Sequence, residues 1–208
     1  MLDTTMLDAV MTKCPVIPVL VIPDLSLARP IAQALVAGGL TTLEVTLRTE
    51  CALDAIREMA KVEGAHVGAG TVLNGDDLAR AVDAGSQFIV SPGLTPEVAA
   101  AAQRHDVPLL PGVANAGDIM RGLDLGLSRF KFFPAMANGG LPALKALASV
   151  FGKVRFCPTG GISEANAPEW LAESAVSCVG GSWLTAGTFD AAAVEQRARA
   201  ASRMGKRD

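Results

Sequence analysis

The sequence predicts a (β/α)8 barrel, also called a TIM barrel, with an extra helix at its N-terminus. Short apolar runs rich in β-branched residues alternate with Ala- and Leu-rich stretches at helical spacing, with a period of about 24 residues. The pattern repeats eight times, and each expected strand is followed by an expected helix. Eight parallel strands with one helix apiece close most naturally into a barrel, because closure removes both sheet edges and allows right-handed crossovers.

Each expected strand is a short apolar run, and the eight runs follow one another at similar spacing. In chain order the expected strands are Val16–Ile22, Leu43–Leu47, His66–Ala69, Phe88–Ser91, Leu109–Pro111, Phe130–Phe132, Arg155–Pro158 and Ser177–Gly180.

The expected helices have apolar residues at helical spacing, and several end on glycine, as a left-handed C-cap prefers. Ala37 is followed by Gly38 and Gly39, and Ala84 is followed by Gly85. In chain order the helices are Leu27–Ala37, Ala52–Lys61, Asp76–Ala84, Pro96–Arg104, Ala116–Leu125, Leu141–Phe151, Asn166–Glu173 and Ala191–Arg203. We expect a further helix over Asp3–Lys13 to cover the bottom of the barrel.

A doubly wound open sheet is the alternative architecture. No GxGxxG motif opens its first crossover, and an eighth strand-helix unit would be surplus to the common versions of that fold. No Pro/Ser-rich linker or run of charges interrupts the chain. We therefore expect residues 1–208 to form a single domain.

The composition argues against several classes of protein. With 18 Lys and Arg against 21 Asp and Glu, the net charge of -3 does not favour a nucleic-acid-binding protein. The longest apolar stretch, Cys14–Ile22, is too short to span a bilayer and contains two prolines. Residues Met1–Met11 include two aspartates and no basic residue, unlike a secretory signal. We expect a cytoplasmic protein with neither a membrane nor a nucleic acid as partner.

The cysteines and histidines do not form a metal-binding pattern. No CxxC pair occurs, and two histidines are too few for the usual Cys/His zinc arrangements. These residues are Cys14, Cys51, Cys157, Cys178, His66 and His105. We interpret the cysteines as reduced, mostly buried apolar residues and expect no metal ion.

The second expected strand has a charged residue on its inner face. Period-two geometry places Glu44, Thr46 and Arg48 on one face and three apolar residues on the other, which should pack against helices. Glu44 then points into the barrel. A salt-bridged pair that only stabilises the strand end is the alternative. Because an ionised carboxylate in a barrel interior is costly unless partnered, we favour a functional Glu44.

The sixth expected strand contains a lysine among three aromatic residues, Phe130, Phe132 and Phe133. Lysine is almost never buried without a reason, and burial among rings favours the neutral amine that attacks a carbonyl to form a Schiff base. The alternative is an outward-pointing lysine that reaches solvent between helices. An outward Lys131 would push its bulky neighbours inward, so we favour catalysis.

Glycine-rich segments follow the last two expected strands. Thr159-Gly160-Gly161-Ile162-Ser163 follows the seventh, and Gly180-Gly181-Ser182 follows the eighth. In barrels, the loops at these two positions often bind phosphate through exposed backbone N–H groups, and Ser182 could add a donor. Thr71, Pro92 and Asn115 lie in turns after the third, fourth and fifth strands, and on composition alone these are ordinary turns.

Four longer strings match a known family over nearly the whole chain. They are Leu43-Glu44-Val45-Thr46-Leu47-Arg48-Thr49, Val67-Gly68-Ala69-Gly70-Thr71-Val72-Leu73, Phe130-Lys131-Phe132-Phe133-Pro134-Ala135 and Arg155-Phe156-Cys157-Pro158-Thr159-Gly160-Gly161-Ile162. Through them the sequence closely resembles the class I 2-keto-3-deoxy-6-phosphogluconate (KDPG) and 4-hydroxy-2-oxoglutarate aldolases. The resemblance implies that Lys131 forms a Schiff base, that Glu44 moves protons, and that Arg48 and Thr71 hold the pyruvyl carboxylate.

The same resemblance implies the rest of the site and the assembly. Thr159, Gly160, Gly161 and Ser182 are expected to contact the hydroxyls and phosphate of the substrate. Pro92 and Phe133 are expected to line the pocket, without a metal or organic cofactor. The resemblance also implies a homotrimer.

The chain departs from the family pattern at two places. Members often have Glu after the FFPA string, where this chain has Met136, and the Asn115-Ala116-Gly117 segment differs from a Thr-Pro-containing version. Thr159 is more informative, because related enzymes that act on the galactonate epimer have an apolar residue near that position. This favours the gluconate-derived substrate.

The implied reaction is cleavage of 2-dehydro-3-deoxy-6-phosphogluconate to pyruvate and glyceraldehyde 3-phosphate, a lyase step of the Entner-Doudoroff pathway. One alternative is a Schiff-base lyase for 4-hydroxy-2-oxoglutarate or the galactonate epimer. Another is a phosphate-binding barrel isomerase or epimerase, which would share the glycine loops without needing the lysine. A sugar-phosphate-binding module without activity is the third, and the Glu44 and Lys131 pair argues against it.

Overall fold

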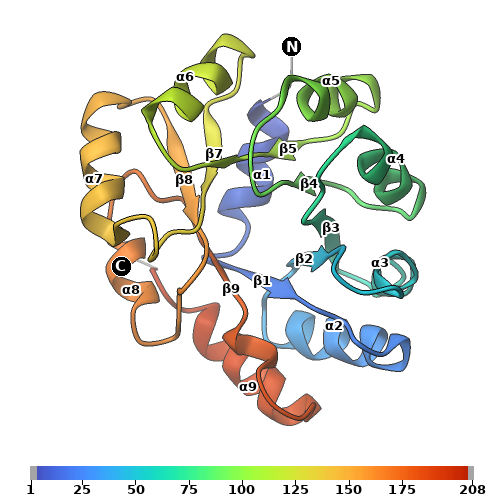
Figure 1. Cartoon of the computed structure of the whole chain (residues 1–208). Coiled ribbons are helices and arrows are strands. Elements are labelled where there is room, and N and C mark those ends of the chain that lie inside the picture. The colour runs from blue at the N-terminus through green and yellow to red at the C-terminus, as the bar shows by residue number, and fades with distance from the viewer. Residues whose placement is uncertain (1–3, 206–208) are drawn as a thin grey trace.

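The computed structural model describes the backbone of residues 4–205 and the side chains of residues 6–205. Parallel strands alternate with helices along this part of the chain, and in Figure 1 the strands surround a centre with helices α2 to α9 outside them. The strands are β1 Val16–Leu20, β2 Thr42–Thr46, β3 His66–Gly70, β4 Ile89–Val90, β5 Leu109–Leu110, β6 Gly112–Val113, β7 Arg129–Phe132, β8 Arg155–Pro158 and β9 Val179–Gly181.

The helices occupy the predicted stretches with small differences at their ends. They are α1 Thr4–Thr12, α2 Ala28–Ala37, α3 Ala52–Met59, α4 Gly75–Asp83, α5 Pro96–Arg104, α6 Ala116–Asp124, α7 Gly140–Val150, α8 Ala167–Leu171 and α9 Ala191–Ala201, with short 3-10 helices η1 Leu25–Leu27 and η2 Trp183–Thr185. The predicted glycine C-caps are confirmed, because Gly39 and Gly85 have φ angles of 91° and 96°. No helix in the described part of the chain is long and apolar enough to cross a membrane.

The strands join into a closed ring. Six of them hydrogen-bond in the order β5-β4-β3-β2-β1-β9, and three more in the order β6-β7-β8. Parallel bridges from Phe156 to Val176 and from Thr159 to Gly180 connect β8 to the segment containing β9. At the other edge, β5 and β6 follow one another in the chain around Pro111. The predicted (β/α)8 barrel is therefore confirmed.

The fifth strand differs from the prediction. A single strand over Leu109–Pro111 was expected, but β5 pairs with β4 and β6 pairs with β7 on either side of Pro111. Proline has no N–H to give to a ladder, so the regular pairing breaks there. The Pro111 carbonyl still accepts a hydrogen bond of 2.9 Å from the Lys131 backbone N–H. Together β5 and β6 occupy one position in the barrel.

The ends of several other elements also differ from expectation. The fourth strand is shorter than Phe88–Ser91, and the Ser91 hydroxyl donates to the Gly93 carbonyl at 2.7 Å in the turn that follows it. The last strand covers Val179–Gly181 rather than Ser177–Gly180. Helix α8 is also shorter than its predicted stretch.

The N-terminal helix closes one end of the barrel, as predicted. Leu7, Val10 and Met11 of α1 belong to the apolar cluster that fills the barrel interior. Asp8 forms a two-point ion pair with Arg129, the first residue of β7, so α1 lies at the end where the strands begin. In Figure 1 this helix crosses the centre of the strand ring. Asp3, where the predicted helix begins, lies outside the described residues.

Cys178 and Cys157 belong to the apolar cluster inside the barrel. All four cysteines are free, as expected, and three of them are buried. A hydrogen bond with Cys157, together with complete burial, raises the pKa of the Cys178 thiol well above its usual range. A thiol of this kind is protonated and unreactive at neutral pH.

His66 makes the stability of the fold depend on pH. Its ring stacks on Phe88 at 5.5 Å, and partial burial, with a smaller contribution from the charge of Lys13, lowers the pKa of His66. The unfolded chain then binds the proton more readily than the folded chain. This histidine should therefore reduce the free energy of unfolding as the pH falls below about 6.5, the ordinary histidine pKa. Urea unfolding at pH 7.5 and 5.0 should show a larger loss in the native protein than in a His66→Gln variant; equal losses would contradict this.

Candidate active site

A lysine and a glutamate meet inside the barrel. Lys131 on β7 and Glu44 on β2 come from opposite sides of the ring, and the Lys131 Nζ lies 3.0 Å from Glu44 Oε1 and 3.5 Å from Oε2. The lysine is 6% exposed and the glutamate 3%. The predicted inward orientation of both side chains is confirmed, and Phe130 and Phe132 instead pack in the apolar cluster between strands and helices.

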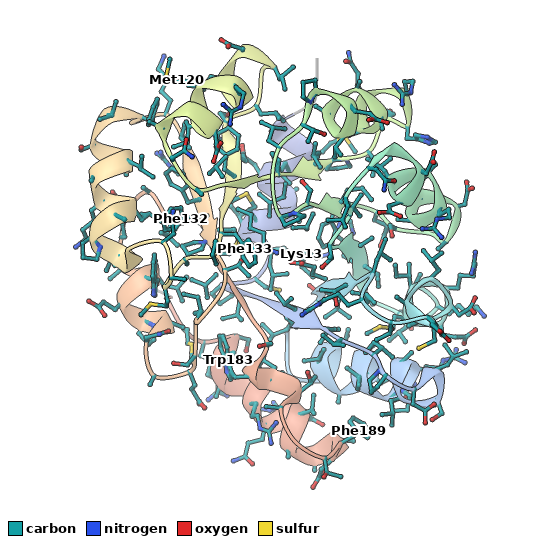
Figure 2. All side chains as sticks on the ribbon, viewed as in Figure 1. Lys13, Met120, Phe132, Phe133, Trp183 and Phe189 are labelled. Atoms are coloured by element: carbon teal, nitrogen blue, oxygen red, sulfur yellow. The ribbon has the colours of Figure 1, made fainter. Side chains whose placement is uncertain are left out.

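The burial of the Lys131 and Glu44 pair is better explained by a catalytic role than by stabilisation of the fold. Taking both charges out of water offsets most of the attraction between them, so a buried ion pair is weak evidence for a stabilising role. The Lys131 Nζ also lies 5.4 Å from the centre of the Phe133 ring, whose side chain Figure 2 shows near the middle of the strand ring. An amine and a carboxylate within hydrogen-bond distance can exchange a proton directly. The arrangement thus supplies a nucleophile with an adjacent acid-base group.

Two glycines make room for the polar side chains in the barrel interior. A methyl group on Gly70 would lie 2.2 Å from Glu44 Oε1, and one on Gly180 would lie 2.3 Å from Thr159 Oγ1. Gly70 was not predicted as a site residue, and Gly180 was noted only as part of the glycine-rich segment after the eighth expected strand. Their importance becomes visible once the strands are paired. Strand β3, which ends at Gly70, lies beside the strand of Glu44, and Gly180 forms a bridge with Thr159.

A cation lies just beyond the end of β2. Arg48 is exposed, and its Nε donates a 3.1 Å hydrogen bond to the Thr46 hydroxyl. Thr46 follows Glu44 by two residues on the same inward face, so Arg48 lies farther than Glu44 toward the open end of the barrel. This hydrogen bond holds the guanidinium at the end of β2, the strand that carries Glu44.

Thr71 follows the neighbouring strand β3 and has an unusual backbone. Its φ angle is 60°, in the left-handed region that β-branched residues rarely adopt. The adjacent Gly70 carbonyl accepts a 2.8 Å hydrogen bond from the Leu47 N–H, which brings the ends of β2 and β3 together. Thr71 and Arg48 therefore lie at neighbouring strand ends. Strain of this kind concentrates at binding sites.

The two glycine-rich loops also lie side by side. Gly160 and Gly161 have φ angles of 102° and 77°, which leaves their backbone in a conformation that favours glycine. The bridge between Thr159 and Gly180 joins the ends of the two strands that precede the loops. Thr159 is buried, whereas Ser182 is exposed. These loops and the lysine strand open at the same end of the barrel, because all the strands are parallel.

Met136 lies against the first of these loops. Its backbone N–H donates to the Gly160 carbonyl at 3.0 Å, and a methyl group on Gly161 would come within 2.6 Å of the Met136 side chain. Pro92 is half-buried after β4, and its carbonyl lies where a side chain at Gly112 would have to be. Both residues therefore lie after strands at the end of the barrel that carries the glycine loops.

The described residues contain no group of three or more His, Cys, Asp or Glu side chains arranged to hold a metal ion. Among the side chains that the structure describes, the buried acidic and basic ones are those of Glu44 and Lys131.

Sequence comparisons relate the chain to characterised enzymes. The family model for KDPG and KHG aldolase matches residues 7–197. The 2-dehydro-3-deoxy-phosphogluconate aldolase of Zymomonas mobilis is 59% identical over 197 residues, covering 94% of this chain and 95% of that protein. The KHG/KDPG aldolase of Escherichia coli strain K12 is 56% identical over 181 residues, covering 86% of this chain and 85% of that protein.

Solved structures give the same relationship. The KDPG aldolase of Legionella pneumophila, with pyruvate captured at low pH as a covalent carbinolamine intermediate, has a TM-score of 0.91 and 44% identity, and the match covers 94% of this chain and 97% of that one. Because the family model spans most of the sequence and two curated relatives are more than half identical, the chain belongs to the KDPG and KHG aldolase family.

Proposed function

We propose that this protein is a class I aldolase that cleaves 2-dehydro-3-deoxy-6-phosphogluconate to pyruvate and glyceraldehyde 3-phosphate. The observation that carries this proposal is the buried pair in which Lys131 Nζ lies 3.0 Å from Glu44 Oε1. A Schiff-base lyase needs an amine in a dry site and a group that moves protons beside it. Family membership and the activities named for the Zymomonas and Escherichia coli relatives support the same reaction.

The first half of the reaction forms an iminium. The neutral Lys131 amine, its proton passed to Glu44, attacks the C2 ketone of the substrate and gives a carbinolamine. Glu44 then returns a proton to the departing hydroxyl, and water leaves as the C2–N double bond forms. The covalent carbinolamine captured in the Legionella enzyme is the corresponding state in a relative.

The second half breaks the carbon-carbon bond. Glu44 removes the proton of the C4 hydroxyl, the C3–C4 bond breaks, and its electron pair moves toward the iminium to give an enamine. Glyceraldehyde 3-phosphate leaves with the new aldehyde at the former C4. Protonation of the enamine at C3 and addition of water then release pyruvate and restore Lys131. These steps use only side chains of the chain and water.

The binding groups take opposite ends of the substrate. Arg48 and Thr71, at neighbouring strand ends, bind the carboxylate next to the reacting ketone. Gly160, Gly161 and Ser182 bind the phosphate through backbone N–H groups and a hydroxyl.

The remaining contacts orient the carbon chain. Thr159, buried beside the lysine strand, donates to a substrate hydroxyl and favours the gluconate-derived epimer. Pro92 and Phe133 contact the apolar part of the pyruvyl group. Fixing both ends in this way places C2 against the Lys131 amine.

The proposal extends to the setting of the enzyme. We place the protein in the cytoplasm, as a homotrimer, at the cleavage step of the Entner-Doudoroff pathway. Every proposed contact comes from one barrel, so the chain acts as a single catalytic domain. Cleavage of 4-hydroxy-2-oxoglutarate is a side reaction that needs the same lysine and carboxylate site.

Reductive trapping tests the proposal. Incubation with pyruvate and borohydride should add about 72 Da to the intact protein, because the imine loses water and gains two hydrogens on reduction. Peptide mapping should place the adduct on Lys131. The absence of an adduct in folded protein would contradict the Schiff-base mechanism. Steady-state kinetics with the gluconate-derived substrate, its galactonate epimer and 4-hydroxy-2-oxoglutarate then identify the preferred substrate.

A further inference from the structure

We propose that Thr46 is a positioning residue that fixes Arg48 in the orientation needed to bind the substrate carboxylate. This inference rests on the proposed function, in which Arg48 is the carboxylate ligand. Thr46 is 1% exposed, so its hydroxyl cannot exchange partners with bulk solvent. Its role depends on the two hydrogen bonds that this hydroxyl makes.

The hydroxyl is held in one orientation. Thr46 Oγ1 donates its single hydrogen to the Leu20 carbonyl of β1 at 2.8 Å, which leaves its lone pairs to accept. One lone pair accepts the Nε–H of Arg48 at 3.1 Å. The backbone repeats the connection, because the Arg48 N–H donates to the Thr46 carbonyl at 2.8 Å. Arg48 is thus tied to the barrel wall through both its main chain and its side chain.

Anchoring Nε leaves the outer part of the guanidinium available. Within residues 4–205, the two Nη atoms of Arg48 make no hydrogen bond or ion pair, and the residue is exposed to solvent. A free arginine of this length loses much conformational freedom when it binds a ligand. An arginine that is already fixed at Nε presents its remaining N–H groups in a preformed arrangement that can bind both oxygens of a carboxylate.

Removal of the Thr46 hydroxyl should therefore weaken binding and leave the chemistry intact. For Thr46→Val, which keeps the shape of the side chain, we expect the pyruvate concentration for half-maximal borohydride trapping to rise roughly tenfold. The trapping rate at saturating pyruvate should stay within about twofold, because the carboxylate is bound equally before and during the reaction. Should this variant not fold, Thr46→Cys carries the same expectation with a smaller rise.

Two matched variants separate the hydroxyl from general packing. Thr46→Ser keeps both hydrogen bonds and should behave like the native protein. Thr42 lies two residues before Glu44 on the same strand, is fully buried, and has a hydroxyl with no partner among the described residues. Thr42→Val should leave half-saturation unchanged. An equal rise in Thr42→Val and Thr46→Val would overturn the proposal.

A double variant tests whether Thr46 acts through Arg48. If it does, Thr46→Val should cause no further rise in a protein that already has Arg48→Gln, because the anchored group is gone. Effects that multiply, or a fall in the saturating rate instead of a rise in half-saturation, would overturn the proposal.

A measurement without substrate separates this inference from the proposed function. Hydrogen exchange at Arg48 Nε–H, followed by NMR in the ligand-free protein, should be slow in the native and Thr46→Ser proteins and fast in Thr46→Val. If native protein traps no pyruvate, the proposed function fails, and slow exchange still establishes Thr46 as the anchor of Arg48. Equal exchange rates of the Arg48 Nε–H in all three proteins would overturn the proposed role of Thr46.

Discussion

Replacement of Lys131 by methionine is expected to abolish aldol cleavage, with kcat lower by at least about four orders of magnitude. Methionine has a similar length but no amine, so no Schiff base can form. Glu44 remains in place and cannot supply this covalent step. The measurement is steady-state cleavage with product aldehyde detected by a coupled assay, together with borohydride trapping of pyruvate. Retained cleavage in Lys131→Met would mean that the reaction does not proceed through a Schiff base on Lys131.

The control is a surface lysine. Lys145 on α7 lies 3.7 Å from Glu173, with 57% of its side chain exposed. Exposed pairs of this kind contribute at most about 1 kcal/mol, so Lys145→Met should keep full activity and near-native stability.

Lys131→Met also tests how the buried pair affects the free energy of unfolding. Lys131→Met leaves the Glu44 carboxylate buried without its cationic partner, which should lower the free energy of unfolding by about 3–5 kcal/mol. A double variant with Glu44→Gln removes the unpaired charge and should recover at least about 1 kcal/mol while remaining inactive. Recovered stability without recovered activity separates the chemistry of Lys131 from its contribution to folding.

The barrel could be predicted from the sequence because its elements depend on local periodicity. The strand-helix alternation was sufficient for the ring and for the helix that covers its bottom. The break at Pro111 was not predicted, since it depends on which neighbour each half of the strand pairs with. A run of apolar residues does not by itself determine which backbone hydrogen bonds a strand forms with its neighbours. Missing N–H groups and tertiary pairing decide where regular hydrogen bonding stops.

For the candidate site, the sequence predicted which way the two central side chains point but not which atoms they contact. Period-two alternation placed Glu44 inside the barrel, the bulk of its aromatic neighbours favoured an inward Lys131, and the structure confirms both orientations. Their 3.0 Å contact joins residues 87 positions apart, so it follows from ring closure and side-chain length rather than from local sequence. The hydrogen bond between Arg48 and Thr46 lies at the end of β2, where strand periodicity no longer describes the backbone. The φ angle of Thr71 likewise has no signal in its residue type.

Replacement of Gly70 by alanine is expected to lower kcat by about 100-fold, because a misplacement of about 1 Å at a catalytic group can have an effect of this size. The new methyl group would lie 2.2 Å from Glu44 Oε1 and 2.7 Å from both Cγ and Cδ. The contact includes the middle of the side chain, so rotation of the carboxylate alone cannot relieve it. Glu44 must move, and its hydrogen bond to Lys131 is then lost or lengthened. Kinetics and urea unfolding of Gly70→Ala measure both consequences.

A second glycine and a truncated Glu44 side chain complete this test. Gly152→Ala places its methyl group where no atom lies within 4 Å and should leave kcat unchanged. In Gly70→Ala combined with Glu44→Ala, the Cγ, Cδ and Oε1 atoms that the methyl group meets are gone, so the free energy of unfolding should approach that of Glu44→Ala alone. Activity should stay low, because no carboxylate remains beside Lys131. Native kcat in Gly70→Ala would mean that the reaction does not need the Glu44 carboxylate beside the Lys131 amine.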